Sequence, residues 1–382
     1  MTSVFYLFRD APQRRAALAA TPGSAERYVL FGLDQVAERG WATSHNLVAA
    51  KRPPVWARGA GAATKSVLEH AGGYGGDFAT VLASLRRANR ADVILSTVDT
   101  VGIPLMLINR AGRVRPPLVY VAVGLPERLA RLRSERMRRL YARALGASAA
   151  VLAYSEFEVE ELRRWLAAYG AVTRVEFVPF GVDERAFVPS DVRPSVDVVS
   201  IGADPHRDFE LLFTVATELP DRSFRVVTTE DRARRLGKVP SNVELEWDLP
   251  FEAMRRRLEE ARIVALPVRD NSYSGATTVL LQALASAKPV VVSRTRAVAG
   301  GYGLIDGENC RLVEPADAAA FRRALAEVLC DEQLVRALGS TARRTVERQL
   351  TWGRYVGRVE ALLEAAADSP LGRPPKRYRR RA

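Results

Sequence analysis

The clearest chemical feature of the sequence is a small-residue turn at Ser274 and Gly275, which leads into an apolar segment of helical periodicity. Lys288 and Pro289 end that helix, and the β-branched run at 290–292 predicts a buried parallel strand. The first N–H groups of a helix lack intrahelical partners and lie at the positive end of its dipole, so this turn is suited to bind an anion. The same pattern also fits an ordinary loop–helix–strand unit, and a lone glycine turn does not decide between the two.

Other short motifs that would indicate a particular chemistry are missing from the sequence. The chain has no G-x-G-x-x-G between a strand and a helix, no P-loop and no G-x-S-x-G, and the glycines at 72–76 do not have the dinucleotide-binding context. Its three histidines, His45, His70 and His206, are scattered and do not form a zinc pattern. The sequence therefore favours neither a dinucleotide-dependent oxidoreductase nor a zinc enzyme.

Length and composition bound the class of protein. A chain of 382 residues with 48% hydrophobic residues exceeds one core and predicts two domains. No apolar run is long enough to span a bilayer, and the N-terminus does not resemble a signal peptide. Two cysteines, Cys310 and Cys330, are too few for a disulfide framework and fit a reducing compartment, so we expect a cytoplasmic protein.

The net charge of +13 is unevenly distributed along the chain. Residues 1–185 carry 26 basic and 17 acidic residues, residues 186–368 carry 25 and 27, and the tail 369–382 carries six basic residues and no acid. The basic parts could contact phospholipid, nucleic acid or a phosphorylated substrate, or the arginines could serve only solubility. Nucleic acid is the least expected partner, because the basic residues lack interleaved aromatic residues apart from Tyr378.

Alternating strands and helices predict a doubly wound parallel sheet in the first half of the chain. We expect strands at 4–8, 46–49, 92–96, 117–121, 149–154 and 175–178. We expect helices at 24–38, 77–90, 124–145 and 156–168, with a mobile glycine-rich loop at 56–77.

The alternation restarts after a proline-dotted linker at 179–195. Strands are expected at 196–201, 223–228, 243–245, 263–266, 290–292 and 310–313. Helices are expected at 208–219, 250–261, 317–330, 332–349 and 352–366. The basic tail from Ser369 onward has nothing apolar to bury and should be disordered.

Four stretches in this order resemble the GT-B glycosyltransferases, and most closely their retaining, nucleotide-sugar-dependent family four. Residues 179–183 resemble the P-x-G-V-D linker of that family, and residues 306–309 resemble its D-G-E-N. Residues 23–40 resemble its acceptor-side glycine loop and first helix, and the Ser274 turn resembles its donor site. The resemblance covers residues 3–366. It implies two Rossmann-like domains facing across a cleft, with boundaries at 1–185, 186–351, a crossing helix at 352–368 and a tail at 369–382.

The resemblance implies a nucleoside-diphosphate sugar bound mostly by the C-terminal domain, with no further cofactor. The E-x7-E pair of the family falls on Ser274 and Gln282, so both carboxylates are missing here. Gln282 can hydrogen-bond ribose hydroxyls, and Asp270 could replace the missing carboxylate. The turn residues Ser274, Gly275, Ala276 and Thr277 are expected to hold the donor diphosphate.

The diphosphate-binding cations of the family follow the first strand of the C-terminal domain. In the family these cations are an arginine and a lysine. Here Arg207 occupies the position of the lysine, Ala203 occupies the position of the arginine, and His206 precedes Arg207. A surface arginine at a helix start is the alternative reading of Arg207, but a guanidinium suits a diphosphate well, and we expect Arg207 to be catalytic. Residues 120–124 lack the histidine often found there, so the leaving phosphate is expected to take the acceptor proton, without a metal ion.

Three further regions carry weaker expectations from the resemblance. Trp247, Asp248 and Leu249 lie where the family often holds the nucleobase, although an ordinary strand–helix turn is as plausible. Gly23, Ser24 and Glu26 would belong to the acceptor side. The arginine-rich helix at 127–145 could lie on an anionic membrane or present a solvated face, the second being the simpler reading.

The sequence therefore predicts a retaining glycosyltransferase that moves a sugar to the hydroxyl of a glycan, a lipid-linked acceptor or a small molecule. It is expected in the cytoplasm, with peripheral contact to the inner face of the membrane as a further expectation. A catalytically weak relative that acts as a binding partner, and a nucleotide-sugar epimerase of the same fold, are the alternatives. The sugar, the base and the acceptor stay open.

Overall fold

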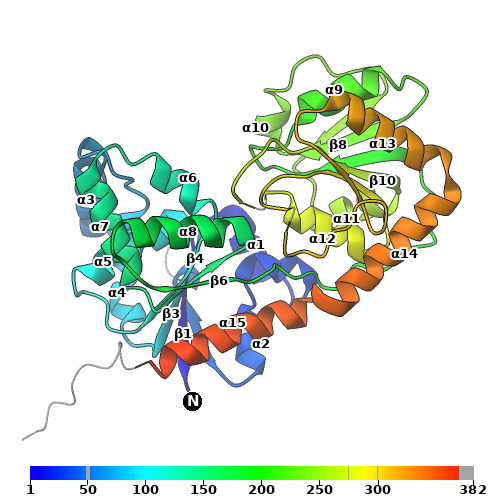
Figure 1. The fold of residues 1–382 in the computed structure, drawn as a ribbon. Coiled ribbons are helices and arrows are strands. Elements are labelled where there is room, and N and C mark those ends of the chain that lie inside the picture. The colour runs from blue at the N-terminus through cyan, green and yellow to red at the C-terminus, as the bar shows by residue number, and fades with distance from the viewer. Residues whose placement is uncertain (49–51, 274, 299, 370–382) are drawn as a thin grey trace, which may run out of the picture. The chain divides into compact units, whose positions relative to one another are not determined.

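The computed structural model describes residues 1–48, 52–273, 275–298 and 300–369, and it divides the chain into two compact units. Unit 1 consists of Met1–Val178 together with the chain from Val356, and unit 2 is Pro179–Tyr355. Each unit contains one six-stranded sheet, with helices on its faces (Figure 1). The prediction of one parallel α/β sheet in each half of the chain is confirmed.

The sheet of unit 1 has the order β2-β1-β3-β4-β5-β6, and every neighbouring pair is parallel. Its strands are β1 (Ser3–Leu7), β2 (Ala42–His45), β3 (Val93–Thr97), β4 (Leu118–Val121), β5 (Ala150–Ala153) and β6 (Arg174–Phe177). Its helices are α1 (Pro12–Ala19), η1 (Ala25–Leu30), α2 (Leu33–Glu38), η2 (Asn46–Val48), α3 (Val55–His70), α4 (Phe78–Ala88), α5 (Asp99–Arg110), α6 (Leu125–Ala130), α7 (Glu135–Gly146) and α8 (Glu156–Ala168). Strands β3, β4 and β5 are wholly buried, as the central strands of a doubly wound sheet must be.

The sheet of unit 2 has the order β12-β11-β10-β7-β8-β9, again parallel throughout. Its strands are β7 (Val196–Ile201), β8 (Phe224–Thr228), β9 (Val243–Trp247), β10 (Ala261–Leu266), β11 (Val290–Ser293) and β12 (Arg311–Val313). Its helices are α9 (Phe209–Thr217), α10 (Glu230–Ala233), α11 (Phe251–Glu259), α12 (Thr277–Ala285), α13 (Ala318–Cys330) and α14 (Glu332–Gln349). The first strand of the unit, β7, has β8 on one side and β10 on the other, so the strand order reverses between β7 and β10.

Helix α15 (Trp352–Ala367) belongs to both units, because the division falls between Tyr355 and Val356. The predicted boundary at 185 differs, since residues 179–185 belong to unit 2. There the Phe180 ring packs against Trp352 and Tyr355, and Val182 forms a bridge to Thr351. The part of α15 that belongs to unit 1 is fixed by an ion pair of 2.6 Å between Arg39 and Glu360.

Several local predictions in the first half of the chain are wrong. The expected mobile loop at 56–77 is mostly helix α3, since Pro54 lies at its N-cap and Gly61 lets α3 approach α4. A Cβ at Gly61 would lie 2.7 Å from the backbone nitrogen of Ala79. The expected strand at 46–49 is η2, because the Asn46 side chain bonds both backbone groups of Phe8; Ala49 lies outside the described residues.

Two expected long helices are each divided in the structure. The helix predicted at 24–38 is interrupted at Phe31 and Gly32, which have φ angles of 55° and 81°. The helix predicted at 124–145 is α6 followed by α7, because the Ser134 hydroxyl accepts the N–H of Met137 and starts a new helix there.

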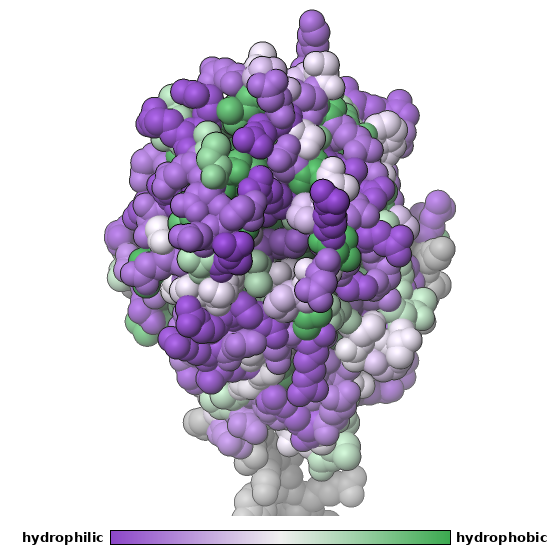
Figure 2. Space-filling model, turned by 90° about the vertical axis from the view of Figure 1, so that its right-hand side faces the viewer, coloured by the Kyte–Doolittle hydropathy of each residue, from purple (hydrophilic) through white to green (hydrophobic). Residues whose placement is uncertain are grey.

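The surface seen in Figure 2 is dominated by hydrophilic residues, with apolar residues in small separate spots. Within the part of the chain that the structure describes, no helix combines the length and apolarity needed to cross a bilayer. The basic tail lies outside the described residues from 370 onward.

Candidate functional site

The loops that follow β7 and β10 meet where the strand order of unit 2 reverses. The N–H of Asp208 donates to the carbonyl of Pro267 at 2.9 Å, and the N–H of Arg269 donates to the carbonyl of His206 at 2.8 Å. Arg207 and Val268 form an antiparallel bridge between these two contacts. Ligands of open α/β sheets bind beyond the carboxyl ends of the strands at such a reversal, so these loops form the first candidate site.

Asp204 lies against the start of α12, in the turn that the sequence singled out. Its carboxylate accepts the Tyr273 hydroxyl at 2.8 Å and the N–H of His206 at 2.8 Å. A Cβ on Gly275 would lie 2.7 Å from the Asp204 carboxylate, so only glycine allows this approach. The protein thus places one of its own carboxylates beside the N-terminal turn of a nine-residue helix that has no side-chain cap.

Arg207 follows Asp204 in the same loop, and its side chain is only 1% exposed. Its Nη2 donates to the carbonyl of Ile201 at 2.6 Å and to the Ser200 hydroxyl at 3.2 Å. Its Nε and Nη1 have no hydrogen-bond partner among the described residues. A buried guanidinium with unmet donors is costly unless a ligand supplies the missing acceptors.

A pocket of about 360 Å³ opens beside Arg207, between the loops that follow β7 and β8. We call it the arginine pocket, because four guanidinium-bearing side chains line it: Arg207, Arg232, Arg235 and Arg269. The Phe209 ring lies between two of them, with its centroid 5.8 Å from the Arg207 guanidinium carbon and 5.1 Å from that of Arg232. The pocket is therefore a cationic site at the carboxyl edge of the sheet.

Burial lowers the pKa of Arg207 to about 9, Asp204 opposes that shift, and the charge of Arg232 adds to it. The pKa of Arg232 is also lowered, first by burial and then by Arg269, against the raising effect of Asp204, Asp208 and Glu210. Arg232 thus raises the free energy of charging Arg207, and Arg269 raises that of charging Arg232. An anion in the pocket would oppose both effects.

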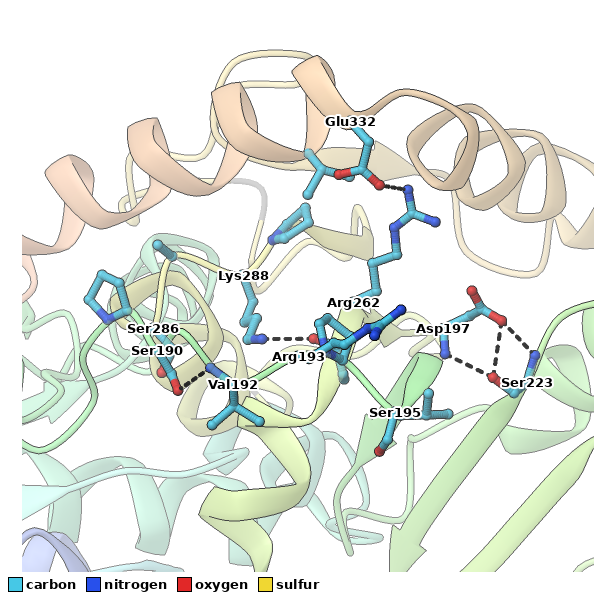
Figure 3. Close-up of a pocket in the computed structure, with 17 residues that line it drawn as sticks. Ser190, Val192, Arg193, Ser195, Asp197, Ser223, Arg262, Ser286, Lys288 and Glu332 are labelled. Carbon is cyan, nitrogen blue, oxygen red and sulfur yellow. Dashed lines mark hydrogen bonds and ion pairs between the residues drawn. The ribbon is translucent and has the colours of Figure 1, made fainter.

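A larger pocket, of about 620 Å³, lies at the opposite edge of the same sheet (Figure 3). It is lined by the residues that begin β7, β10 and β11. Lys288 donates there to the carbonyls of Glu259 and Ala261 at 2.6 and 2.8 Å, and Arg262 pairs with Glu332. Lys288 thus caps the carboxyl end of α11, and these two cations already have protein partners.

The carboxyl edge of the sheet in unit 1 also carries buried charge. Asp99 is 1% exposed and accepts the Tyr120 hydroxyl at 2.6 Å and Arg128 Nε at 2.7 Å. The wholly buried Glu158 accepts the N–H groups of Gly124 and Leu125 at 2.9 and 3.1 Å, which fixes the start of α6. We call these four side chains the acidic cluster: Asp99, Tyr120, Arg128 and Glu158.

Comparison with known proteins concerns first the part of the chain that carries the arginine pocket. Residues 197–331 match the family model described as glycosyl transferases group 1, and we call this segment the group 1 domain after that model. It contains β7 apart from its first residue, the loop with Asp204 and Arg207, and all of α12. The predicted resemblance to family four is thereby confirmed.

Two curated relatives align with parts of the chain. The MMP alpha-(1->4)-mannosyltransferase of Mycolicibacterium hassiacum is 28% identical over 205 residues, which cover 50% of this chain and 49% of that protein. A GDP-mannose-dependent monoacylated alpha-(1-6)-phosphatidylinositol monomannoside mannosyltransferase of Corynebacterium glutamicum is 26% identical over 251 residues, which cover 58% and 64%. The chain thus spans about half of the first relative and less than two thirds of the second.

Solved structures show the fold over nearly the whole chain. Sucrose-phosphate synthase from Thermosynechococcus elongatus has a TM-score of 0.70 at 16% identity and covers 95% of this chain and 98% of its own. Anabaena HepE in complex with UDP-glucose has a TM-score of 0.67 at 14% identity and covers 96% and 100%. The fold is GT-B, as predicted, while the predicted cleft between the two domains stays a prediction.

In the group 1 domain, the predicted donor residues fall into three groups. Arg207 lines the arginine pocket. Gly275 and the buried Ala276 and Thr277 lie at the start of α12. Ser274 is outside the described residues. Gln282 is buried on α12, with 3% of its side chain exposed. Asp270 forms an ion pair of 2.7 Å with Arg296, so its carboxylate is already engaged.

The predicted nucleobase region lies at the edge of the group 1 domain. Trp247 is the last residue of β9, two residues beyond the predicted end of that strand, and its side chain is 48% exposed. Asp248 has a φ of 52° and accepts the N–H of Glu230 at 3.4 Å. Leu249 follows it before α11.

The described side chains contain no group of His, Cys, Asp or Glu that could hold a metal ion.

The predicted acceptor-side loop of unit 1 is built around a residue that the sequence did not indicate. Arg27 pairs with Asp34 at 2.5 Å, donates to the carbonyls of Ala17, Leu18 and Ala20, and is buried. Asp34 also accepts the N–H of Gly23 at 3.2 Å, while Ser24 is the N-cap of η1 and Glu26 lies in its first turn. The loop is therefore a fixed part of unit 1.

Sequence reasoning also missed Arg232, Asp204 and Tyr273. Arg232 comes from the loop after β8, a position that the carboxyl-edge rule could have marked. Asp204 and Tyr273 are 69 residues apart, so only the fold shows that they meet.

Proposed function

We propose that this chain is a glycosyltransferase that moves a sugar from a nucleoside-diphosphate sugar to an acceptor hydroxyl, with retention of configuration. The observation that carries the proposal is the buried Arg207, whose Nε and Nη1 lack partners among the described residues, at the carboxyl edge of a group 1 domain. A diphosphate supplies the acceptors and the negative charge that this guanidinium lacks.

In the proposed reaction, the bond between the anomeric carbon and the diphosphate oxygen breaks as the acceptor oxygen bonds to the same carbon. The electron pair of the broken bond stays on the departing diphosphate, whose oxygen takes the proton of the acceptor hydroxyl. Negative charge grows on the diphosphate during this step, so Arg207 and the first N–H groups of α12 would stabilise the transition state most. Because Arg207 is desolvated, its charge acts more strongly there than at the surface.

The names of the two curated relatives support a mannosyl donor, and one of them is described as GDP-mannose-dependent. HepE, whose fold this chain shares, was solved with UDP-glucose. We therefore propose GDP-mannose as the first donor to test and UDP-glucose as the second. The proposed chemistry draws its positive charge from protein side chains, so we expect turnover to be unaffected by EDTA.

The experiment is a nucleoside-diphosphate release assay with a panel of nucleotide sugars, run alongside thermal denaturation of the same samples. The proposal expects one donor both to raise the melting temperature and to release its nucleoside diphosphate. A donor that stabilises the protein without any release, with water or with a panel of glycan and lipid-linked acceptors, would favour the alternative of a binding relative. Release of an epimerised nucleotide sugar would instead identify an epimerase.

A further inference from the structure

Arg232 approaches Arg207 from a different strand connection. It lies on α10, after β8, and its Nη2 donates to the backbone carbonyl of Arg207 at 2.5 Å. Both guanidiniums contact the ring of Phe209, which begins α9. The two side chains therefore belong to one arrangement, although 25 residues separate them in the sequence.

The unpaired donors of this arrangement belong to residues that line the arginine pocket or adjoin it. Arg207 Nε and Nη1, Arg232 Nε and the Thr228 hydroxyl are buried and have no hydrogen-bond partner within the described part of the chain. Arg207 and Arg232 both line the pocket, as does Thr229, the neighbour of Thr228. Buried polar atoms are nearly always paired, so several unpaired ones around a single cavity indicate a ligand with several acceptor atoms.

The surrounding carboxylates offset the burial of these two cations only in part. Arg269 forms ion pairs with Glu210 at 2.8 Å and with Asp208 at 3.5 Å. The Asp204 carboxylate accepts hydrogen bonds from the Tyr273 hydroxyl and the His206 N–H. Asp231 and Arg235 lie on the pocket wall and are exposed. The pKa of Arg207 is lowered by burial and by the charge of Arg232, and the pKa of Arg232 is lowered by burial and by the charge of Arg269.

We propose that Arg232 is the second cation of the donor diphosphate site, in place of the cation that is missing at Ala203. The inference rests on the proposed function for the identity of the ligand. Its chemistry, a polyanion with tetrahedral phosphate groups, follows from two guanidiniums with free N–H donors in one pocket. Ala203 itself lines this pocket, so a cation from the loop after β8 reaches the space beside it.

Titration of the full chain with inorganic pyrophosphate tests the inference without requiring a sugar donor. The informative variant is Arg232→Gln, because glutamine keeps an N–H donor for the Arg207 carbonyl but removes the charge. Arg234→Ala is the matched control: this neighbouring arginine is exposed, pairs with Glu230 and does not line the pocket. We expect Arg232→Gln to weaken pyrophosphate binding about tenfold or more, Arg232→Lys to recover part of it, and Arg234→Ala to leave it unchanged.

Wild-type affinity in a folded Arg232→Gln protein would overturn the inference, and so would a wild-type protein that does not bind pyrophosphate. An equal loss in Arg234→Ala would also overturn it, because the effect would then be one of net charge. If pyrophosphate binding depends on Arg232 but no nucleotide sugar is turned over, the anion site stands and the proposed glycosyl transfer fails.

Discussion

The carboxyl edges of the two sheets carry buried charge in opposite ways. In unit 1 Asp99 of the acidic cluster meets Arg128 and Tyr120, and Glu158 Oε1 meets two backbone N–H groups. Glu158 Oε2 has no hydrogen-bond partner among the described residues, and in unit 2 the same holds for Arg207 Nε, Arg207 Nη1 and Arg232 Nε of the arginine pocket. The buried acids of unit 1 thus each have an N–H or cationic partner within the protein, whereas the arginine pocket of unit 2 leaves several cationic donors unpaired.

This difference indicates which edge is built for a polyanion. A satisfied polar network stabilises and rigidifies the protein that contains it, whereas unmet buried donors lower stability until a ligand supplies the acceptors. Substitutions in the acidic cluster should therefore change the free energy of unfolding. Substitutions in the arginine pocket should change ligand affinity and turnover.

Replacing Arg207 by Ala should lower turnover roughly a hundredfold or more, by about 2–4 kcal/mol, through loss of a charge-assisted contact to the departing diphosphate. Because charge grows on the diphosphate in the transition state, kcat should fall more than donor affinity. Steady-state kinetics with the donor found in the release assay measure this. The control is Arg262→Ala, which removes a guanidinium at the opposite edge of the sheet. A near-normal kcat/KM in Arg207→Ala would show that the diphosphate lies elsewhere.

Replacing Glu158 by Gln should change how stability depends on pH. Burial, and secondarily the charge of Asp99, raise the pKa of Glu158 to about 8, from an ordinary value of 4.5. Between pH 4.5 and pH 8 the folded protein therefore holds a proton that the unfolded chain releases. The free energy of unfolding that this proton contributes falls as pH rises through that interval, by up to about 1.4 kcal/mol per pH unit.

Urea unfolding at pH 5 and pH 8 measures this loss. We expect the wild type to lose stability over that interval and Glu158→Gln to lose much less. The exposed Glu160 on the same helix provides the control variant Glu160→Gln, which should behave as the wild type does. The same pH dependence in wild type and Glu158→Gln would contradict the assignment.

Replacing Asp204 by Asn should tighten pyrophosphate binding, by about 1 kcal/mol or roughly fivefold, because it removes a negative charge beside the site. Asparagine can still accept the His206 N–H with its carbonyl oxygen, and its NH2 group can donate to the Tyr273 hydroxyl oxygen in place of the bond that Asp204 accepts. Calorimetric titration compares it with Asp191→Asn, an exposed site elsewhere in unit 2. Weaker pyrophosphate binding in Asp204→Asn would mean that this carboxylate organises the site rather than opposing the anion.

Truncation after Ser369 should have the smallest effect, with turnover of a soluble acceptor unchanged. The removed segment carries six basic residues and lies outside the described part of the structure. Its removal should weaken binding to anionic vesicles, by about 1 kcal/mol for each basic residue near the surface. Loss of turnover in a truncated protein that keeps its melting temperature would contradict this expectation.

Much of the fold could be predicted, because its central strands are short, largely apolar runs and its helices carry clear apolar stripes. Helix α14 occurs at the predicted residues, 332–349. The errors occurred where tertiary contacts override local preference. Gly59 and Gly61 suggested a loop at α3, although Gly61 is needed for close packing on Ala79, and nothing local indicated that Phe31 would adopt a left-handed backbone conformation.

The candidate site was predictable only in part. The position of Arg207 after the first strand of unit 2, and that of Gly275 before α12, followed from the alternation of strands and helices. Arg232 and Asp204 were not identified, because their roles depend on which loops lie beside each other at the carboxyl edge. Asp270 as the substitute for the missing carboxylate stays a prediction, and its carboxylate pairs with Arg296 in the structure.

A double-mutant cycle tests whether Arg207 and Arg232 bind the same diphosphate. It compares the binding of GDP and UDP by the wild type, Arg207→Ala, Arg232→Gln and the double variant. We expect the second substitution to weaken binding much less once the first is present, with an interaction energy of about 1 kcal/mol or more. Additive losses, or unchanged affinity in either single variant, would contradict it.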